Sequence, residues 1–144
     1  MTNEKPQIFI DIDCKDLKTK VDEYENRGWR FVNICGSTVE GGVELIYSFS
    51  DGLPLENLRF TVPNGSTIPS VSGCFPNAFF FENETYDLFG VKFSGVSIDF
   101  DGKFYKVSVP TPMNPQSVQA REYAAQAAGA GAAATADDDA KGGE

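Results

Sequence analysis

Few side chains in this 144-residue chain could carry out chemistry, because the sequence contains no histidine. That absence excludes Ser-His-Asp and Cys-His nucleophiles, histidine-bound zinc or haem, and an imidazole proton switch. The three cysteines, Cys14, Cys35 and Cys74, include no CxxC pair, and an iron–sulfur cluster usually takes four thiolates. We therefore expect all three to be small buried hydrophobic residues, and we expect no cofactor or metal on this chain.

Two carboxylates, Glu84 and Asp87, are candidates for an acid–base pair. They lie three residues apart in a helix predicted over residues 76–90, with Pro76 in its first turn and Gly90 as its stop. This spacing places both side chains on one helix face, as general acid–base catalysis would need. The same spacing is more typical of a solvated helix face, so catalysis is the less favoured interpretation.

Glu82 and Phe80 break the amphipathic pattern of this helix. Glu82 falls in the middle of the apolar arc, and Phe80 falls among the polar positions. A buried carboxylate without a partner is costly, so Glu82 must be paired, hydrogen-bonded or neutral. Either Glu82 bends out to solvent at the edge of the arc, or the helix is irregular there, or both residues face a second protein. In the last case a cation receives Glu82 and an apolar pocket receives Phe80.

The elements that must position this helix are predicted from hydrophobic periodicity and turn residues. Residues 7–12 alternate as a strand, after which Asp13 caps a helix that ends at Gly28. Three further strands are predicted over residues 29–37, 43–49 and 58–62.

Beyond the second helix, Asp101-Gly102 predicts a type I′ turn that joins residues 96–100 and 103–109 as a hairpin. The order is therefore β-α-β-β-β-α followed by a β-hairpin. This order predicts an α+β fold with a mostly antiparallel sheet and helices on one face.

The composition changes sharply near residue 115. All 12 phenylalanines lie before residue 105, and the remainder is rich in alanine, glycine and aspartate. We expect residues 1–115 to form one α+β domain. Residues 116–144 should be a disordered Ala/Gly-rich acidic tail, with at most a transient helix over residues 117–128.

The charge of the chain limits its partners. Twelve basic and 21 acidic residues give a net charge of -9 and a pI near 4.4. Nucleic-acid binding needs a basic face, and an anionic membrane surface would repel such a chain. No apolar stretch is long enough to span a bilayer, and the first residues do not resemble a signal peptide, so we expect a cytoplasmic location.

The helix predicted over residues 76–90 lies within a longer sequence pattern, Glu82-x-Glu84-x-x-Asp87-Leu88-Phe89-Gly90-Val91-x-Phe93-x-Gly95. This pattern, with Pro-Ser-Val at 69–71 and Phe-Pro-Asn-Ala at 75–78 before it, resembles the signature of the C-subunit family of respiratory complex I. That family is the thirty-kilodalton subunit of NADH dehydrogenase, and the resemblance covers about residues 13–95. It implies partner-binding roles for Phe80, Glu82, Glu84, Asp87, Phe89, Gly90, Phe93 and Gly95.

Two departures refine the resemblance. Asn83 stands where the family usually has arginine, and residues 96–99 replace the His-Pro-Asp-Leu-Arg run that follows the final glycine in complex I members. With its short length, the chain is most similar to the D subunit of Ech-type energy-converting membrane-bound [NiFe] hydrogenases.

The resemblance implies a cofactor-free structural subunit in the hydrophilic arm of such a hydrogenase. It would dock the large catalytic subunit and the iron–sulfur small subunits, peripherally on the cytoplasmic face of the membrane. Iron–sulfur clusters and the Ni-Fe centre, which receive electrons from ferredoxin, are then expected on those partners. Two alternatives are a subunit of NADH dehydrogenase (quinone) or formate hydrogenlyase, and a free-standing small-molecule-binding or regulatory α+β domain.

Overall fold

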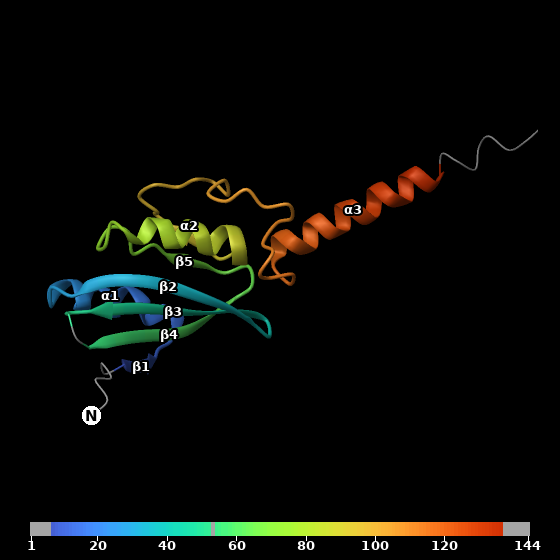
Figure 1. Cartoon of the computed structure of the whole chain (residues 1–144). Helices are drawn as coiled ribbons and strands as arrows, with labels where there is room; N and C mark the ends of the chain where they lie inside the picture. Colours follow the sequence, from blue (N-terminus) through green and yellow to red (C-terminus); the bar gives the residue numbers. More distant parts are fainter. Residues whose placement is uncertain (1–6, 53, 137–144) are drawn as a thin grey trace, which may run out of the picture.

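The computed structural model of the chain describes residues 7–52 and 54–136 and confirms the predicted α+β class (Figure 1). A four-stranded sheet has the order β1-β4-β3-β2, and helices α1 and α2 cover one of its faces. The elements in chain order are β1 (Gln7–Asp11), a 3₁₀ turn η1 (Cys14–Asp16), α1 (Leu17–Asn26), β2 (Arg30–Val39), β3 (Gly42–Ser50), β4 (Leu55–Pro63), β5 (Thr67–Pro69), α2 (Ala78–Phe89), β6 (Lys92–Ser94) and α3 (Val118–Ala136).

The core lies between the sheet and the two helices. Strand β1 runs parallel to β4, whereas β4, β3 and β2 are antiparallel neighbours. Phe31 of β2 and Phe49 of β3 are register partners on the inner face. Tyr24 of α1 stacks on Phe49 with ring centroids 4.2 Å apart, and Phe81 of α2 meets Phe31 edge-on at 5.8 Å. Both helices therefore pack on the same face, as the sequence predicts.

The opposite face of the sheet, the outer face, carries no helix among the described residues. Phe9 is 46% exposed there, Cys35 is exposed and Ile46 is half-buried. Beneath them, Ser48 donates a hydrogen bond to Asn57 Oδ1 at 2.6 Å, and Asn57 donates to the carbonyl of Ile8. Hydrogen-bonded polar groups thus occupy the middle of this face.

The boundaries of the helices follow their predicted caps. Asp13 accepts a hydrogen bond from the Lys15 amide, so it caps the turn η1, and α1 begins after that turn at Leu17. Gly28 has φ +73° just beyond the last residue of α1. Helix α2 starts two residues later than predicted and ends at Gly90, which has φ +78°. Both glycine stops are confirmed.

The hairpin predicted over residues 96–109 is wrong. The turn itself forms, since Asp101 and Gly102 both have positive φ and the Lys103 amide donates to the Phe100 carbonyl. The residues on either side of the turn form no strands. This segment crosses over α2 instead (Figure 1). Polar side chains of the helix form hydrogen bonds with backbone groups of the segment that a strand ladder would use.

A small parallel sheet that the sequence analysis missed joins β5 to β6. Three-residue strands show too little alternation to be recognised from sequence. This sheet lies beside α2 and fixes the chain on both sides of that helix.

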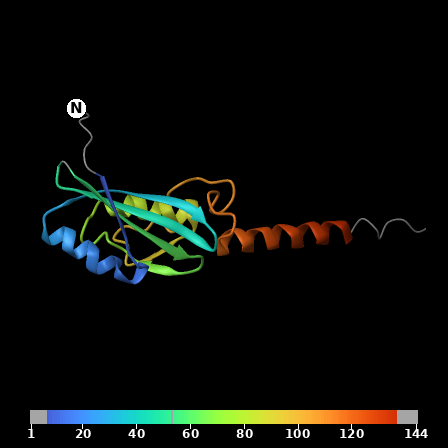
Figure 2. The same cartoon turned by 90° about the horizontal axis from the view of Figure 1, so that it is seen from below.

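The tail begins with helix α3, which extends away from the body in two perpendicular views (Figures 1 and 2). It is longer than the transient helix predicted over residues 117–128, and residues 121–130 are exposed. Its start is attached to the body, because Ser117 is buried and its hydroxyl lies 2.5 Å from that of Thr111. The proposed domain boundary at residue 115 stays a prediction, and residues 137–144 of the predicted tail lie outside the described residues.

Gly90 is expected to be irreplaceable. A Cβ there would lie 2.9 Å from Gln119 Oε1 and 3.0 Å from both Ser117 Cβ and Thr111 Cγ2. Gly90→Ala should therefore lower the free energy of unfolding by about 1–2 kcal/mol for the left-handed backbone, plus about 1–3 kcal/mol for overpacking. Gly41→Ala is the control, since Gly41 has φ +74° but no atom within 4 Å of a Cβ. Equal losses in urea unfolding would show that the Gly90 contacts do not matter.

Candidate docking surface around helix α2

Helix α2 buries two carboxylate side chains and one amide side chain. Glu82 is 0% exposed, and Asn83 and Asp87 are each 5% exposed. Each of them accepts a hydrogen bond from a backbone amide outside the helix. The polar residues of the motif therefore stabilise the structure around the helix.

Glu82 is an internal anchor, so the predicted solvent-exposed and partner-facing positions are both wrong. Its carboxylate accepts hydrogen bonds from Ser70 Oγ at 2.6 Å and from the Val71 amide at 2.7 Å. Burial raises the pKa of Glu82, and the two hydrogen bonds oppose that rise. Ser70 Oγ also lies 2.7 Å from Ser72 Oγ, which accepts from the Ser97 amide. Glu82 thus ties α2 to the chain that precedes it and, through the two serines, to the chain that follows.

Asn83 holds the segment that crosses over α2. Its Nδ2 donates to the Ile98 carbonyl at 2.8 Å, and its Oδ1 accepts from the Phe100 amide at 3.0 Å. An amide side chain can donate and accept at once, whereas a guanidinium can only donate. Asparagine at this position therefore suits the segment 96–100 that replaces the family's usual run.

Glu84 and Asp87 do not form the candidate acid–base pair. Asp87 is buried and its Oδ2 accepts from the Tyr105 amide at 2.7 Å. Glu84 is half-buried and accepts from the Tyr105 hydroxyl at 3.4 Å. The Glu84 carboxylate raises the pKa of Tyr105. The two acids thus contact the backbone and the side chain of one tyrosine.

Aromatic side chains cover the outer side of α2 and the segment above it. Phe80 is 50% exposed and stacks on Phe79 with ring centroids 4.1 Å apart. Phe104 lies 6.0 Å from Phe80 and 5.1 Å from Phe100, and Tyr105 lies 5.0 Å from Phe104. We call these five residues the aromatic surface. Of these, only Phe80 is predicted from sequence, because the others belong to the core arc or to the supposed hairpin.

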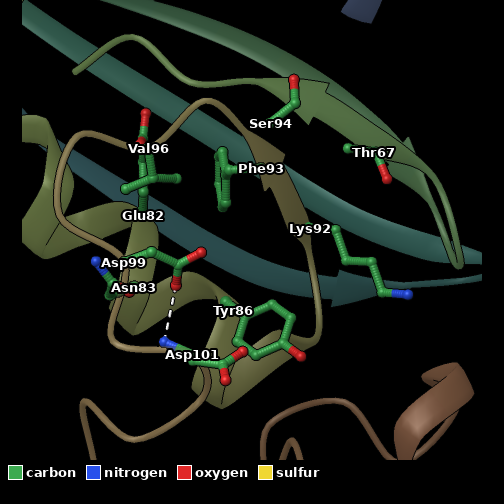
Figure 3. Close-up of a pocket in the computed structure, with 10 residues that line it drawn as sticks. All are labelled: Thr67, Glu82, Asn83, Tyr86, Lys92, Phe93, Ser94, Val96, Asp99 and Asp101. Carbon is green, nitrogen blue, oxygen red and sulfur yellow. Dashed lines mark hydrogen bonds between the residues drawn. The ribbon is translucent and has the colours of Figure 1, made fainter. Parts of the chain in front are cut away.

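A hollow of about 320 Å³ lies beside the aromatic surface, between α2, the β5–β6 sheet and residues 96–101 (Figure 3). Lys92 lies at one side of it, and Asp99, Asp101 and Tyr86 lie toward another. Asp99 accepts a hydrogen bond from the Asp101 amide at 2.8 Å, drawn as a dashed line. Positively and negatively charged side chains therefore both line this hollow.

The remaining motif residues position the end of α2. Phe89 is buried in the core and fits against the sheet because Gly36 has no side chain, since a Cβ there would lie 2.8 Å from the Phe89 ring. Gly90 ends the helix, and Phe93 packs partly buried against the core. Gly95 has φ +77° and is exposed in the turn that follows. Because the side chains of Phe89 and Phe93 are buried or partly buried, they do not support the predicted partner-binding roles. At Gly95 the exposed group is the backbone of the turn.

The cysteine prediction is wrong. Cys35 is exposed, and Cys14 and Cys74 are partly exposed. Cys74 lies with Asp22 and Glu25 in a group whose ligand atoms are within 4.8 Å of one another. Lys18 Nζ already lies 2.6 Å from Asp22 and 3.1 Å from Cys74 Sγ, so a lysine supplies the cation at this group.

None of the described helices has the length and apolar character that a membrane span needs.

Comparison with known proteins identifies the family. A family model described as respiratory-chain NADH dehydrogenase, 30 Kd subunit, matches residues 10–99, which is more than half of the chain. The chain belongs to this family. The predicted resemblance to the complex I thirty-kilodalton subunit is confirmed.

Two relatives in this 30 Kd subunit family align with a part of the chain. The NADH-quinone oxidoreductase C subunit of Mesorhizobium japonicum is 46% identical over 71 residues, 44% of this chain and 34% of that protein. The C subunit of the same enzyme from Methylobacterium sp. is 34% identical over 70 residues, 45% of this chain and 33% of that protein. The chain thus spans about a third of the length of these relatives.

Two solved structures share the fold of this member of the 30 Kd family. A chain of the membrane-bound sulfane sulfur reductase (MBS), an archaeal respiratory membrane complex, matches with a TM-score of 0.65 and 14% identity, covering 81% of this chain and 73% of that chain. The trypsin-resistant fragment (1-134) of Nqo5 matches with a TM-score of 0.55 and 21% identity, covering 62% and 80%.

The raised pKa of Glu82 predicts a pH dependence of stability. A carboxyl group with a higher pKa in the folded chain binds more protons there, so the free energy of unfolding falls as pH rises from the ordinary value of 4.5 through the folded pKa. Glu82→Gln removes this dependence while keeping an acceptor for Val71. Its urea unfolding should vary less between about pH 4.5 and 7 than that of the natural chain. Glu84→Gln is the control, and an unchanged slope in Glu82→Gln would contradict the assignment.

Proposed function

We propose that this chain is a non-catalytic structural subunit of a respiratory membrane complex, and that it docks to other subunits through the aromatic surface. The observation that carries the proposal is the exposed ring of Phe80 among four neighbouring aromatic residues. Large apolar rings on a surface mark contacts with other proteins, and aromatic residues are enriched in the core of interfaces. The membership of the 30 Kd subunit family supports the same role.

The internal hydrogen bonds of α2 support the proposal that the aromatic surface is the side that docks. Because Glu82, Asn83 and Asp87 satisfy backbone groups within the chain, these three polar side chains are directed inward and leave the aromatic rings on the surface. These bonds also fix the crossing segment that carries Phe100 and Phe104. A docking surface held in place before binding loses less conformational entropy on association.

Within this role, we infer an energy-converting [NiFe] hydrogenase of the Ech type as the complex. Residues 96–99, which depart from the pattern of the complex I members, and the fold shared with an archaeal respiratory membrane complex support this choice. The large catalytic subunit and iron–sulfur subunits are the proposed partners, and they carry the Ni-Fe centre and the clusters. The chain itself holds no cofactor and associates peripherally with the cytoplasmic face of the membrane.

A subunit of NADH-quinone oxidoreductase is the second candidate. The 46% identity to the Mesorhizobium japonicum relative over 71 residues favours it. Purification of the tagged chain from native membranes in mild detergent decides between the two, because nickel accompanies only the hydrogenase.

Phe80→Ala tests the docking role. Phe80 is half exposed, so its truncation should change the free energy of unfolding of the chain by less than about 0.5 kcal/mol. Recovery of the chain in the purified complex should fall by about fivefold or more, as expected for an interface anchor. Tyr123→Ala is the matched control, since Tyr123 is 46% exposed on α3. Equal recovery of both variants would contradict docking through Phe80.

A further inference from the structure

A second hollow, of about 250 Å³, shares Tyr86 with the one in Figure 3. It is lined by α2, by residues 102–111 and by Gln119 of α3. Asp87 is the charged residue of its lining, and Val107, Val109 and Pro110 contribute apolar walls. We call it the Asp87 hollow. It combines one buried negative charge with surfaces that an aliphatic chain could contact.

The carboxylate of Asp87 is only half satisfied. Its Oδ2 accepts from the Tyr105 amide at 2.7 Å, but no described residue donates a hydrogen bond to its Oδ1. Asp87 is 5% exposed. A buried charged oxygen without a donor is destabilising, and native structures nearly always provide a partner.

The unpartnered oxygen lies near Gly102, which also lines the hollow. A Cβ on Gly102 would lie 4.0 Å from Asp87 Oδ1 and 3.2 Å from Tyr86 Cε1. Glycine at this position, with φ +76°, therefore avoids a crowded contact with the tyrosine ring beside the carboxylate. The neighbouring lysines, Lys103 and Lys106, are exposed and do not line the hollow.

We propose that the Asp87 hollow receives an arginine side chain of a neighbouring subunit, with its guanidinium hydrogen-bonded to Asp87 Oδ1. This inference rests on the proposed docking function. Guanidinium groups pair with carboxylates and stack on aromatic rings, which Asp87 and Tyr86 offer side by side. The three-carbon stem of arginine matches the apolar walls. The net negative charge of the chain favours the approach of a basic partner surface.

Asp87→Asn tests the site in the assembled complex. Asparagine keeps an acceptor for the Tyr105 amide, so the full-length variant should melt at or above the temperature of the natural chain. Recovery of the variant in the complex should fall about tenfold or more, because a buried partner charge is left unpaired. Glu122→Gln on α3 is the control, with the same loss of charge at an exposed position. Normal assembly of Asp87→Asn, or a large loss of its thermal stability, would overturn the proposal.

A titration of the free chain tests the arginine site independently of the proposed docking function. Ethylguanidinium added to the free natural chain should shift the amide resonances of Gly102 and Tyr105, and ethylammonium at equal ionic strength should shift them less. The shifts should be absent in Asp87→Asn. If no guanidinium-specific shift is seen, the proposal fails even when the chain assembles. If the natural chain does not assemble with a complex but the shifts are seen, the docking function fails while the cation site stands.

Discussion

The structure depends on hydrogen bonds between the side chains of α2 and backbone groups that no sheet or helix satisfies. The chain on either side of α2 has little regular structure, and buried backbone amides need acceptors. Glu82 satisfies the amide before the helix at Val71, and Asn83 and Asp87 satisfy those after it at Phe100 and Tyr105. The helix therefore organises the segments around it, in addition to packing on the sheet.

This use of polar residues determines what the helix presents to solvent. Since its carboxylates and amide point to the chain itself, aromatic rings from α2 and from the crossing segment gather on the outside. The sheet protects the opposite side of the helix, where Phe81 meets Phe31. The buried polar residues of α2 thus stabilise the fold and also hold the aromatic surface in position.

The sequence predicts most of the sheet and the C-terminal ends of the two packed helices. The alternation along β3 and β4 and the glycines at 28 and 90 are local signals, and they lead to the observed elements. The anomaly at Glu82 is visible in the helical periodicity, but its partners lie 11 and 12 residues earlier in an irregular segment. The hairpin prediction fails for a related reason, because Asn83 and Asp87 compete for the backbone groups of a segment whose local pattern favours strands. Long-range side-chain–backbone bonds of this kind have no periodicity to detect.

Site-specific photo-crosslinking in native membranes tests most directly whether the α2 side or the outer face of the sheet meets the rest of the complex. A photoreactive phenylalanine analogue would replace Phe80 in one sample and Phe9 in the other, since both side chains are about half exposed. We expect the probe at position 80 to capture another protein of the purified respiratory complex and the probe at position 9 to capture much less. Capture of a protein of the complex from position 9 alone would contradict docking through the α2 side.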